Sequence, residues 1–141
     1  MDGPLGTAPA TGDVRRFERH AFVCVNAAAC APLGAEAVHK AMKDRLRAAG
    51  LKETLRVNKA GCLGQCGHGP IVVVYPEGTW YSHVTPDEGV RIWEEHVVGG
   101  RPVEDLRYHT EAAGTNVLGK QPDGSFKAVG GPHSSRCSRC P

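Results

Sequence analysis

Six cysteines are the residues of this sequence best suited to chemistry, and four of them form two pairs. Cys24 and Cys30 are separated by five residues, and Cys62 and Cys66 are separated by three. Thiolates can act as nucleophiles, redox groups or soft metal ligands. Because Cys24 does not begin a Cys-x-x-Cys motif, we expect no thioredoxin-type redox chemistry at that position. The two pairs therefore point to metal binding.

Each cysteine pair follows a segment with the pattern of a β-strand. His20–Asn26 is a short apolar and aromatic run, and Leu55–Lys59 alternates apolar and polar residues. Between them, residues 34–49 place apolar side chains at helical spacing and end at Gly50. A strand–helix–strand crossover sets the two strands side by side, so both loops should open at the same edge of the sheet. The four thiols are then expected to converge near the surface.

The second half of the domain is expected to complete a mixed sheet. Ile71–Tyr75 and Thr79–Val84 flank a Pro-Glu-Gly turn and predict a hairpin. Thr85 and Glu88 predict a capping box at the start of a helix that ends at Gly99. The apolar stripe of this helix consists of Val90, Trp93 and Val97. We expect an α/β fold, a mixed β-sheet flanked by helices in the order β-α-β-β-β-α.

The chain is expected to divide into three regions. Residues 1–19 resemble a flexible N-terminal arm, residues 20–108 the folded domain, and residues 109–141 a weakly structured C-terminal tail. A Pro-Asp-Gly turn within residues 117–129 predicts a small hairpin. The tail also holds Cys137 and Cys140 in a Cys-x-x-Cys, for which a disordered thiol pair, metal capture with a partner and redox sensing all stay open.

Composition limits the classes of partner and compartment. With 141 residues, 40% hydrophobic content and a net charge of +2, the chain gives no support to a nucleic-acid partner. No apolar run is long enough to span a membrane, and the first twenty residues lack the apolar core of a signal peptide. We therefore expect a cytoplasmic protein with no nucleic-acid and no membrane partner. Disulfides are disfavoured in that reducing compartment.

Four thiolates suit either zinc or an iron–sulfur cluster. Structural zinc usually draws on ligand pairs with two to four residues between them, and the gap between Cys24 and Cys30 is wider. A two-iron cluster is longer than one ion and tolerates that gap, while nearby glycines let backbone N–H groups approach its negatively charged sulfurs. The glycines are Gly61, Gly64, Gly67 and Gly69. We expect a [2Fe–2S] cluster, and a zinc-binding structural or interaction module is the alternative.

The sequence around these cysteines resembles the thioredoxin-like [2Fe–2S] ferredoxin family. The likeness covers about residues 21–98, and its specific part is the second cysteine pair with its glycines and the strand that follows Pro70. The chain is also similar, more distantly, to the small thioredoxin-like iron–sulfur subunit of respiratory NADH dehydrogenases. The resemblance implies a thioredoxin-like fold, a homodimer, and cluster ligation by four thiolates. These ligands would be Cys24, Cys30, Cys62 and Cys66.

The function implied by the resemblance is one-electron transfer by a ferredoxin, which is a carrier and not an enzyme. Its partners would be redox proteins that the sequence does not name. The alternative is an iron–sulfur subunit of an NADH- or formate-dehydrogenase-type complex.

Several other side chains carry expectations of their own. His68 is expected to be a loop residue or hydrogen-bond donor near the cluster, and Lys59 and Gln65 to be solvated. Three aromatic residues, Trp80, Tyr81 and Trp93, are expected to fill the core. The exposed face of the helix at residues 34–49 is basic, and it is either a solvated surface or a docking face for an acidic redox partner. Its basic residues are Lys40, Lys43, Arg45 and Arg47.

Overall fold

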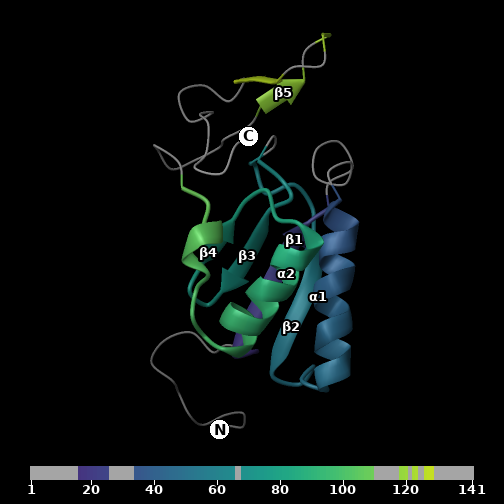
Figure 1. Cartoon of the computed structure of the whole chain (residues 1–141), viewed down its shortest axis with the longest axis vertical. Coiled ribbons are helices and arrows are strands. Elements are labelled where there is room, and N and C mark those ends of the chain that lie inside the picture. Colours follow the sequence, from purple (N-terminus) through teal and green to yellow (C-terminus); the bar gives the residue numbers. More distant parts are fainter. Residues whose placement is uncertain are drawn as a thin grey trace, which may run out of the picture.

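The structure of the chain is a computed structural model that describes residues 16–25, 34–65, 68–109, 118–120, 122–123 and 126–128. The main domain follows the expected order of strand, helix, strand, strand, strand and helix (Figure 1). The predicted α/β class with a mixed sheet is therefore confirmed. The expected N-terminal arm falls almost entirely outside the described residues, and the three-region division stays a prediction.

A four-stranded sheet in the order β2-β1-β3-β4 forms the centre of the domain. Strand β1 (Arg19–Cys24) pairs in parallel with β2 (Leu55–Ala60) and antiparallel with β3 (Val72–Tyr75). Strand β4 (Thr79–Tyr81) completes the predicted hairpin with β3. The crossover has thus placed β1 beside β2, as expected, and left β2 at an edge.

Helix α1 (Ala35–Ala49) provides the crossover between the two parallel strands. Its buried side chains include Val38, Met42 and Leu46, which recur at the spacing of one helical face. The helix ends at Gly50, whose φ of 67° lies in the left-handed region that glycine adopts without steric cost. This element and its end agree with the sequence prediction.

The last helix begins as predicted but changes its winding halfway. Helix α2 (Pro86–Arg91) starts with a complete capping box between Thr85 and Glu88. From Arg91 it continues into the π-helix η2 (Ile92–Val98), so the expectation of a single α-helix up to Gly99 is wrong. The wider π turn, closed by bonds such as Gly99 N–H to the Glu94 carbonyl at 3.2 Å, brings residues four and five apart onto one face. The side chains buried in this way are Ile92, Trp93, His96 and Val97.

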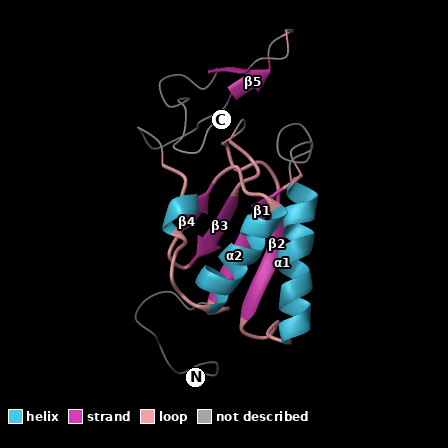
Figure 2. Ribbon diagram, viewed as in Figure 1, coloured by secondary structure: helices cyan, strands magenta, loops and turns pink. Residues whose placement is uncertain are grey.

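Both helices cover the same face of the sheet, as Figures 1 and 2 show. The main core forms between them and the strands and includes Ala21 and Val23 of β1. Helix α2 approaches α1 through Gly89, where an added Cβ would lie 3.1 Å from Val38 and 3.3 Å from Met42. The predicted core positions Tyr81 and Trp93 are buried, while Trp80 is partly buried on the other face. Val90, which the predicted apolar stripe of the last helix places in the core, is only partly buried.

Strand β4 is shorter than the predicted Thr79–Val84 because its last residues bond elsewhere. After Tyr81 the chain leaves the sheet, and His83 adopts a φ of 51°. The N–H of His83 donates to the carbonyl of His68 at 2.9 Å, and that of Val84 to Pro70 at 3.1 Å. Residues 82–84 thus support the loop that contains the second cysteine pair.

The chain beyond the last helix adds a short 3₁₀ turn and a hairpin. The turn, η3 (Glu104–Leu106), precedes a bridge between Arg107 and Tyr81. Strands β5 (Leu118–Lys120) and β6 (Phe126–Ala128) pair antiparallel, in agreement with the small hairpin expected there. Among the described residues, no helix has the length and apolar character needed to cross a membrane.

No helix of the described residues covers the second face of the sheet, which carries aromatic side chains. The rings of His20 and Phe22 stack with centroids 4.1 Å apart, and Tyr75 meets Phe22 edge-on at 6.1 Å. Tyr75 is 45% exposed. Together with Phe17 these residues line a hollow of about 260 Å³, and we call this surface the open face.

Candidate metal centre

Cys24 is the last residue of β1 and is fixed by the backbone on both sides. In the parallel register it lies opposite Ala60, the last residue of β2. The Cys24 N–H donates to the carbonyl of Ile71 at 3.0 Å, and the next N–H, of Val25, donates to Ala60 at 2.9 Å. The Cys24 side chain is only 2% exposed. Cys24 is therefore buried at the end of β1, in a cluster with Ile71 and Val73.

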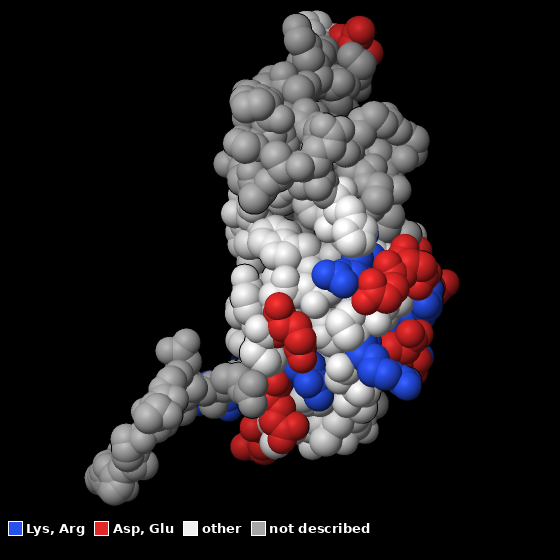
Figure 3. Space-filling view, turned by 90° about the vertical axis from the view of Figure 1, so that its left-hand side faces the viewer, with Lys and Arg blue, Asp and Glu red and all other residues white. Residues whose placement is uncertain are grey.

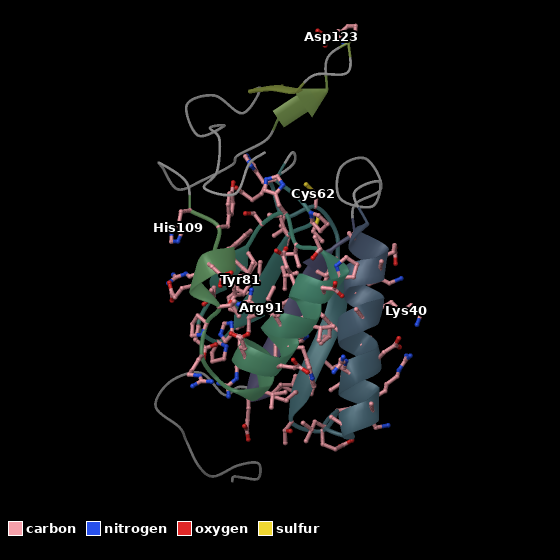
Figure 4. The ribbon with its side chains drawn as sticks, viewed as in Figure 1. Lys40, Cys62, Tyr81, Arg91, His109 and Asp123 are labelled. Atoms are coloured by element: carbon pink, nitrogen blue, oxygen red, sulfur yellow. The ribbon has the colours of Figure 1, made fainter. Side chains whose placement is uncertain are left out.

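Cys62 follows β2 by two residues and is exposed at the same edge, as its position beyond the strand ends in Figure 4 shows. Its Sγ accepts a hydrogen bond from the N–H of Gly64 at 3.3 Å. Gly64 has a φ of 77°, a left-handed conformation that side chains disfavour and that aims this N–H at the sulfur. A Cβ added at Gly61 or Gly64 would meet no atom of the described residues within 4 Å, so these residues leave open space beside the thiol.

The other cysteines fall outside the described residues. Cys30 and Cys66, the remaining predicted ligands, are among them, as are Cys137 and Cys140 of the tail. Within the part of the chain that the structure describes, no three metal-ligating side chains come together. The structure thus brings Cys24 and the Cys62 loop to one edge of the sheet, and the full ligand set stays a prediction.

Three aromatic rings pack beside the loop that contains the second cysteine pair. His68 is completely buried, and its ring lies 5.3 Å from that of Tyr108 and 6.0 Å from that of His83. Tyr108 donates its hydroxyl hydrogen to Oε1 of Gln65 at 2.7 Å, while its N–H donates to the carbonyl of Trp80 at 2.7 Å. Tyr108 therefore connects the edge of β4 to the residue that precedes Cys66.

Two expectations about this loop have different outcomes. Gln65 is partly buried and bonded to Tyr108, so the expectation of a solvated side chain is wrong. Lys59 is 53% exposed and pairs with Glu36 at 2.9 Å, so it does reach solvent as expected. The role of Tyr108 was not predicted, because it lies beyond the expected helix and belongs to no motif.

The described residues fit an iron–sulfur cluster. One thiol is buried and one exposed at the edge where two parallel strands end, with space beside it and a backbone N–H directed at its sulfur. Thiolate sulfur is the preferred ligand of such clusters, and N–H donors to sulfur are a usual part of their surroundings. Fold and site together are those of a small α/β protein whose described thiols suit an iron–sulfur cluster.

Comparison with known proteins identifies the family. The family model of the thioredoxin-like [2Fe–2S] ferredoxins matches residues 14–96. A protein named "Ferredoxin, 2Fe-2S" from Aquifex aeolicus (strain VF5) is 38% identical over 96 residues, which cover 62% of this chain and 86% of the relative. A protein of the same name from Clostridium pasteurianum is 35% identical over 97 residues, covering 64% of this chain and 95% of the relative.

Solved structures agree with this match. The 1.5 Å crystal structure of the wild-type thioredoxin-like [2Fe–2S] ferredoxin from Aquifex aeolicus has a TM-score of 0.59 at 36% identity, covering 66% of this chain and 97% of that one. A further structure of a thioredoxin-like [2Fe–2S] ferredoxin from this organism gives a TM-score of 0.63 at 34% identity, covering 70% and 96%.

The chain therefore belongs to the thioredoxin-like [2Fe–2S] ferredoxins. It is an electron-transfer protein of the [2Fe–2S] type, and the predicted thioredoxin-like fold and cofactor are confirmed. This assignment favours the iron–sulfur cluster over the zinc-binding alternative.

Proposed function

We propose that this chain is a free-standing one-electron carrier whose cluster is held by the thiolates of Cys24, Cys30, Cys62 and Cys66. The observation that carries the proposal is the parallel pairing of β1 with β2, which brings Cys24 and the Cys62 loop to one edge. Cys30 and Cys66 belong to the set by their place in the sequence, since Cys30 follows Cys24 with five residues between them and Cys66 follows Cys62 with three.

The described residues contribute three features to the site: backbone hydrogen bonds that hold Cys24, an N–H group directed at the Cys62 sulfur, and the exposure of Cys62. When bound, a [2Fe–2S] cluster accepts and releases a single electron. The backbone bonds of Cys24 to Ile71 and of Val25 to Ala60 hold the inner side of the site rigid. The N–H of Gly64 stabilises negative charge on the Cys62 sulfur, which favours the reduced state and raises the reduction potential. The exposure of Cys62 offers a partner protein a short route to the site.

Cysteine substitution tests the ligand set directly. The protein purified without oxygen should be brown and contain two irons and two sulfides per chain, as the cluster formula requires. Cys30→Ser should abolish the cluster or change its visible and electron paramagnetic resonance spectra, because it removes one of four thiolates. Cys137→Ser in the tail is the matched control and should leave both spectra unchanged. An intact spectrum in Cys30→Ser would remove Cys30 from the ligand set, and a colourless protein with stoichiometric zinc would overturn the proposal.

The free-standing carrier competes with a subunit of a larger dehydrogenase complex. The names of the relatives from Aquifex aeolicus and Clostridium pasteurianum, both ferredoxins, support the separate carrier. Purification from the native cell at physiological salt should give the chain without a stoichiometric flavoprotein. A stable complex with such a protein would favour the subunit. We place the carrier in the cytoplasm, where a reducing environment keeps unligated thiols reduced.

We also propose that the open face joins two copies of the chain. Its aromatic residues Phe22 and Tyr75 lie on the sheet face that no described helix covers, and such an apolar surface favours association with a partner surface. Tyr75→Glu should convert the dimer to a monomer in sedimentation experiments, whereas Tyr75→Phe should retain the dimer. A wild-type chain that sediments as a monomer would refute this arrangement.

A further inference from the structure

The outer side of α1 and the adjoining edge strand β2 carry an excess of positive charge. A hollow of about 450 Å³ between them is lined by four basic and two acidic side chains, with His39 beside them. The charged residues are Lys40, Lys43, Arg47, Lys59, Glu36 and Asp44. We call this surface, together with Arg56 on β2, the basic face. Lys40 projects outward from α1 in Figure 4, on the side away from Tyr81 and Arg91.

Only two of the cations on the basic face have carboxylate partners. Lys40 pairs with Asp44 at 2.6 Å, and Lys59 pairs with Glu36 at 2.9 Å. Among the described residues, no ion pair involves the remaining three cations. These are Lys43, Arg47 and Arg56.

Arg47 and Arg56 both lie close enough to Lys43 to act on its charge. Burial and the neighbouring charges of Arg56 and Arg47 lower the pKa of Lys43. The pKa of His39 is likewise lowered, first by burial and then by Lys43 and Lys59. The basic face therefore has a positive potential that its own carboxylates do not neutralise.

The opposite side of the molecule shows a different pattern. There Arg91 bridges Asp105 and Glu95 at 3.1 and 3.2 Å, and Arg107 pairs with Glu104. Red and blue side chains accordingly lie next to each other in Figure 3. Compensated charge of this kind gives little long-range attraction, so the basic face is set apart by its excess of cations over carboxylates.

One cation of the basic face, Lys43, has a structural role at the exposed edge of the sheet. The Lys43 ammonium donates to the carbonyl of Val57 on edge strand β2 at 2.8 Å, and lysines at such edges discourage pairing with another chain. Arg47 forms no comparable bond in the described part of the chain, although its charge, after the bond from Lys40, helps to lower the pKa of Asp44. The guanidinium of Arg56 lies 6.0 Å from the centroid of the Phe17 ring, which also lines the open face. Their mutual repulsion with Lys43 has no evident benefit to the isolated fold.

We propose that the basic face is the docking surface for an acidic redox partner protein. This inference rests on the proposed electron-carrier function, because β2 runs from the basic face into the Cys62 loop. Lys59 lies three residues before Cys62, so about 11 Å of chain at most separates their Cα atoms. A partner held by the basic face would thus lie beside the edge at which electrons leave. Complementary charge of this kind speeds encounter and fixes orientation.

Binding of an acidic peptide to the holoprotein tests the basic face. A fluorescent polyglutamate peptide should bind the wild-type chain at low ionic strength and be released by salt. The double variant Arg47→Glu/Arg56→Glu should bind it at least about tenfold more weakly. The matched control Arg45→Glu/Arg101→Glu makes the same change in net charge. Arg45 does not line the basic face and pairs instead with Glu94 at 3.0 Å, so the affinity of this variant should stay within about threefold. Equal weakening in both variants, or no binding by the wild-type chain, would overturn the proposal.

Two further measurements distinguish an acidic protein partner from a nucleic acid and from a folding defect of the variants. A single-stranded oligonucleotide of matched charge should bind more weakly than the peptide, and tighter binding would replace the protein partner by a nucleic acid. The variants must retain the wild-type visible spectrum and sedimentation; if charge reversal prevents folding, Arg47→Gln/Arg56→Gln should still weaken binding. A wild-type chain that binds the peptide but lacks a reducible cluster would refute the proposed function and leave the docking surface standing.

Discussion

A hydrogen-bond chain that runs from the main core to Glu77 allows a quantitative prediction. The Tyr81 oxygen accepts the N–H of Val103 at 2.9 Å and lies 2.7 Å from Nδ1 of His96. On the other side of the imidazole, Nε2 lies 3.2 Å from Oε1 of Glu77. A neutral imidazole with its proton on Nε2 donates to Glu77 and accepts the Tyr81 hydroxyl hydrogen, which satisfies every member.

Tyr81→Phe keeps the buried ring and removes only the oxygen. Both Tyr81 and His96 are fully buried, so water cannot replace the lost group. The Val103 N–H and His96 Nδ1 each lose their partner, at a cost of about 1–3 kcal/mol per group. The free energy of unfolding should therefore fall by at least about 2 kcal/mol. For a domain of this size, that loss lowers the unfolding midpoint by roughly 10 °C.

Circular dichroism during heating of the oxygen-free holoprotein measures this effect. Tyr75→Phe is the matched control, because it makes the same chemical change at a residue that is 45% exposed in the single chain, and it is expected to retain the proposed dimer. The control should change the free energy of unfolding by less than about 0.5 kcal/mol. A Tyr81→Phe variant as stable as the Tyr75→Phe variant would show that the buried chain contributes nothing to stability.

Three other changes have defined outcomes. Gly89→Ala should lower the free energy of unfolding by about 1–3 kcal/mol in urea, because the added Cβ would press on two side chains of α1. Gly61→Ala is the control, since its Cβ enters open space among the described residues, and its loss of stability should be smaller. Burial lowers the pKa of His96, so the unfolded chain binds a proton that the folded chain does not, and stability should decline as pH falls below about 6.5. Urea midpoints across this range should change less steeply in His96→Gln, and identical slopes would contradict the assignment. Tyr108→Phe removes the bond to Gln65, worth about 1 kcal/mol, and should speed bleaching of the visible spectrum by an iron chelator about fivefold; an unchanged rate would argue against a supporting role.

Local patterns in the sequence predicted most of the fold. Alternation identified β2, helical spacing identified α1, and the capping box marked the start of α2. The crossover rule then placed β1 beside β2. These predictions succeed because each depends on neighbouring residues or on a general property of chain connections.

The errors arose where distant contacts decide the outcome. The π turn of η2 buries His96 against Tyr81, and no spacing in the helix itself signals a wider turn. Strand β4 stops early because Val84 bonds to Pro70 instead of continuing the sheet. Such contacts join segments that the sequence pattern treats separately.

The candidate site was predictable to the same degree. Paired cysteines and glycines identified the loops, and the strand order indicated that they meet. The contact between Tyr108 and Gln65 spans 43 residues and joins two common polar groups, so no motif announces it.

The Tyr108 contact also bears on where the functional module ends. The family match stops at residue 96, and the matched segment contains all four proposed ligands. Yet the chain beyond this point returns along β4 to reach the loop beside Cys66. A transplanted or truncated version that ends with the helix would retain every cysteine and lose one of its loop supports. The smallest portable form of this electron carrier therefore extends through Tyr108.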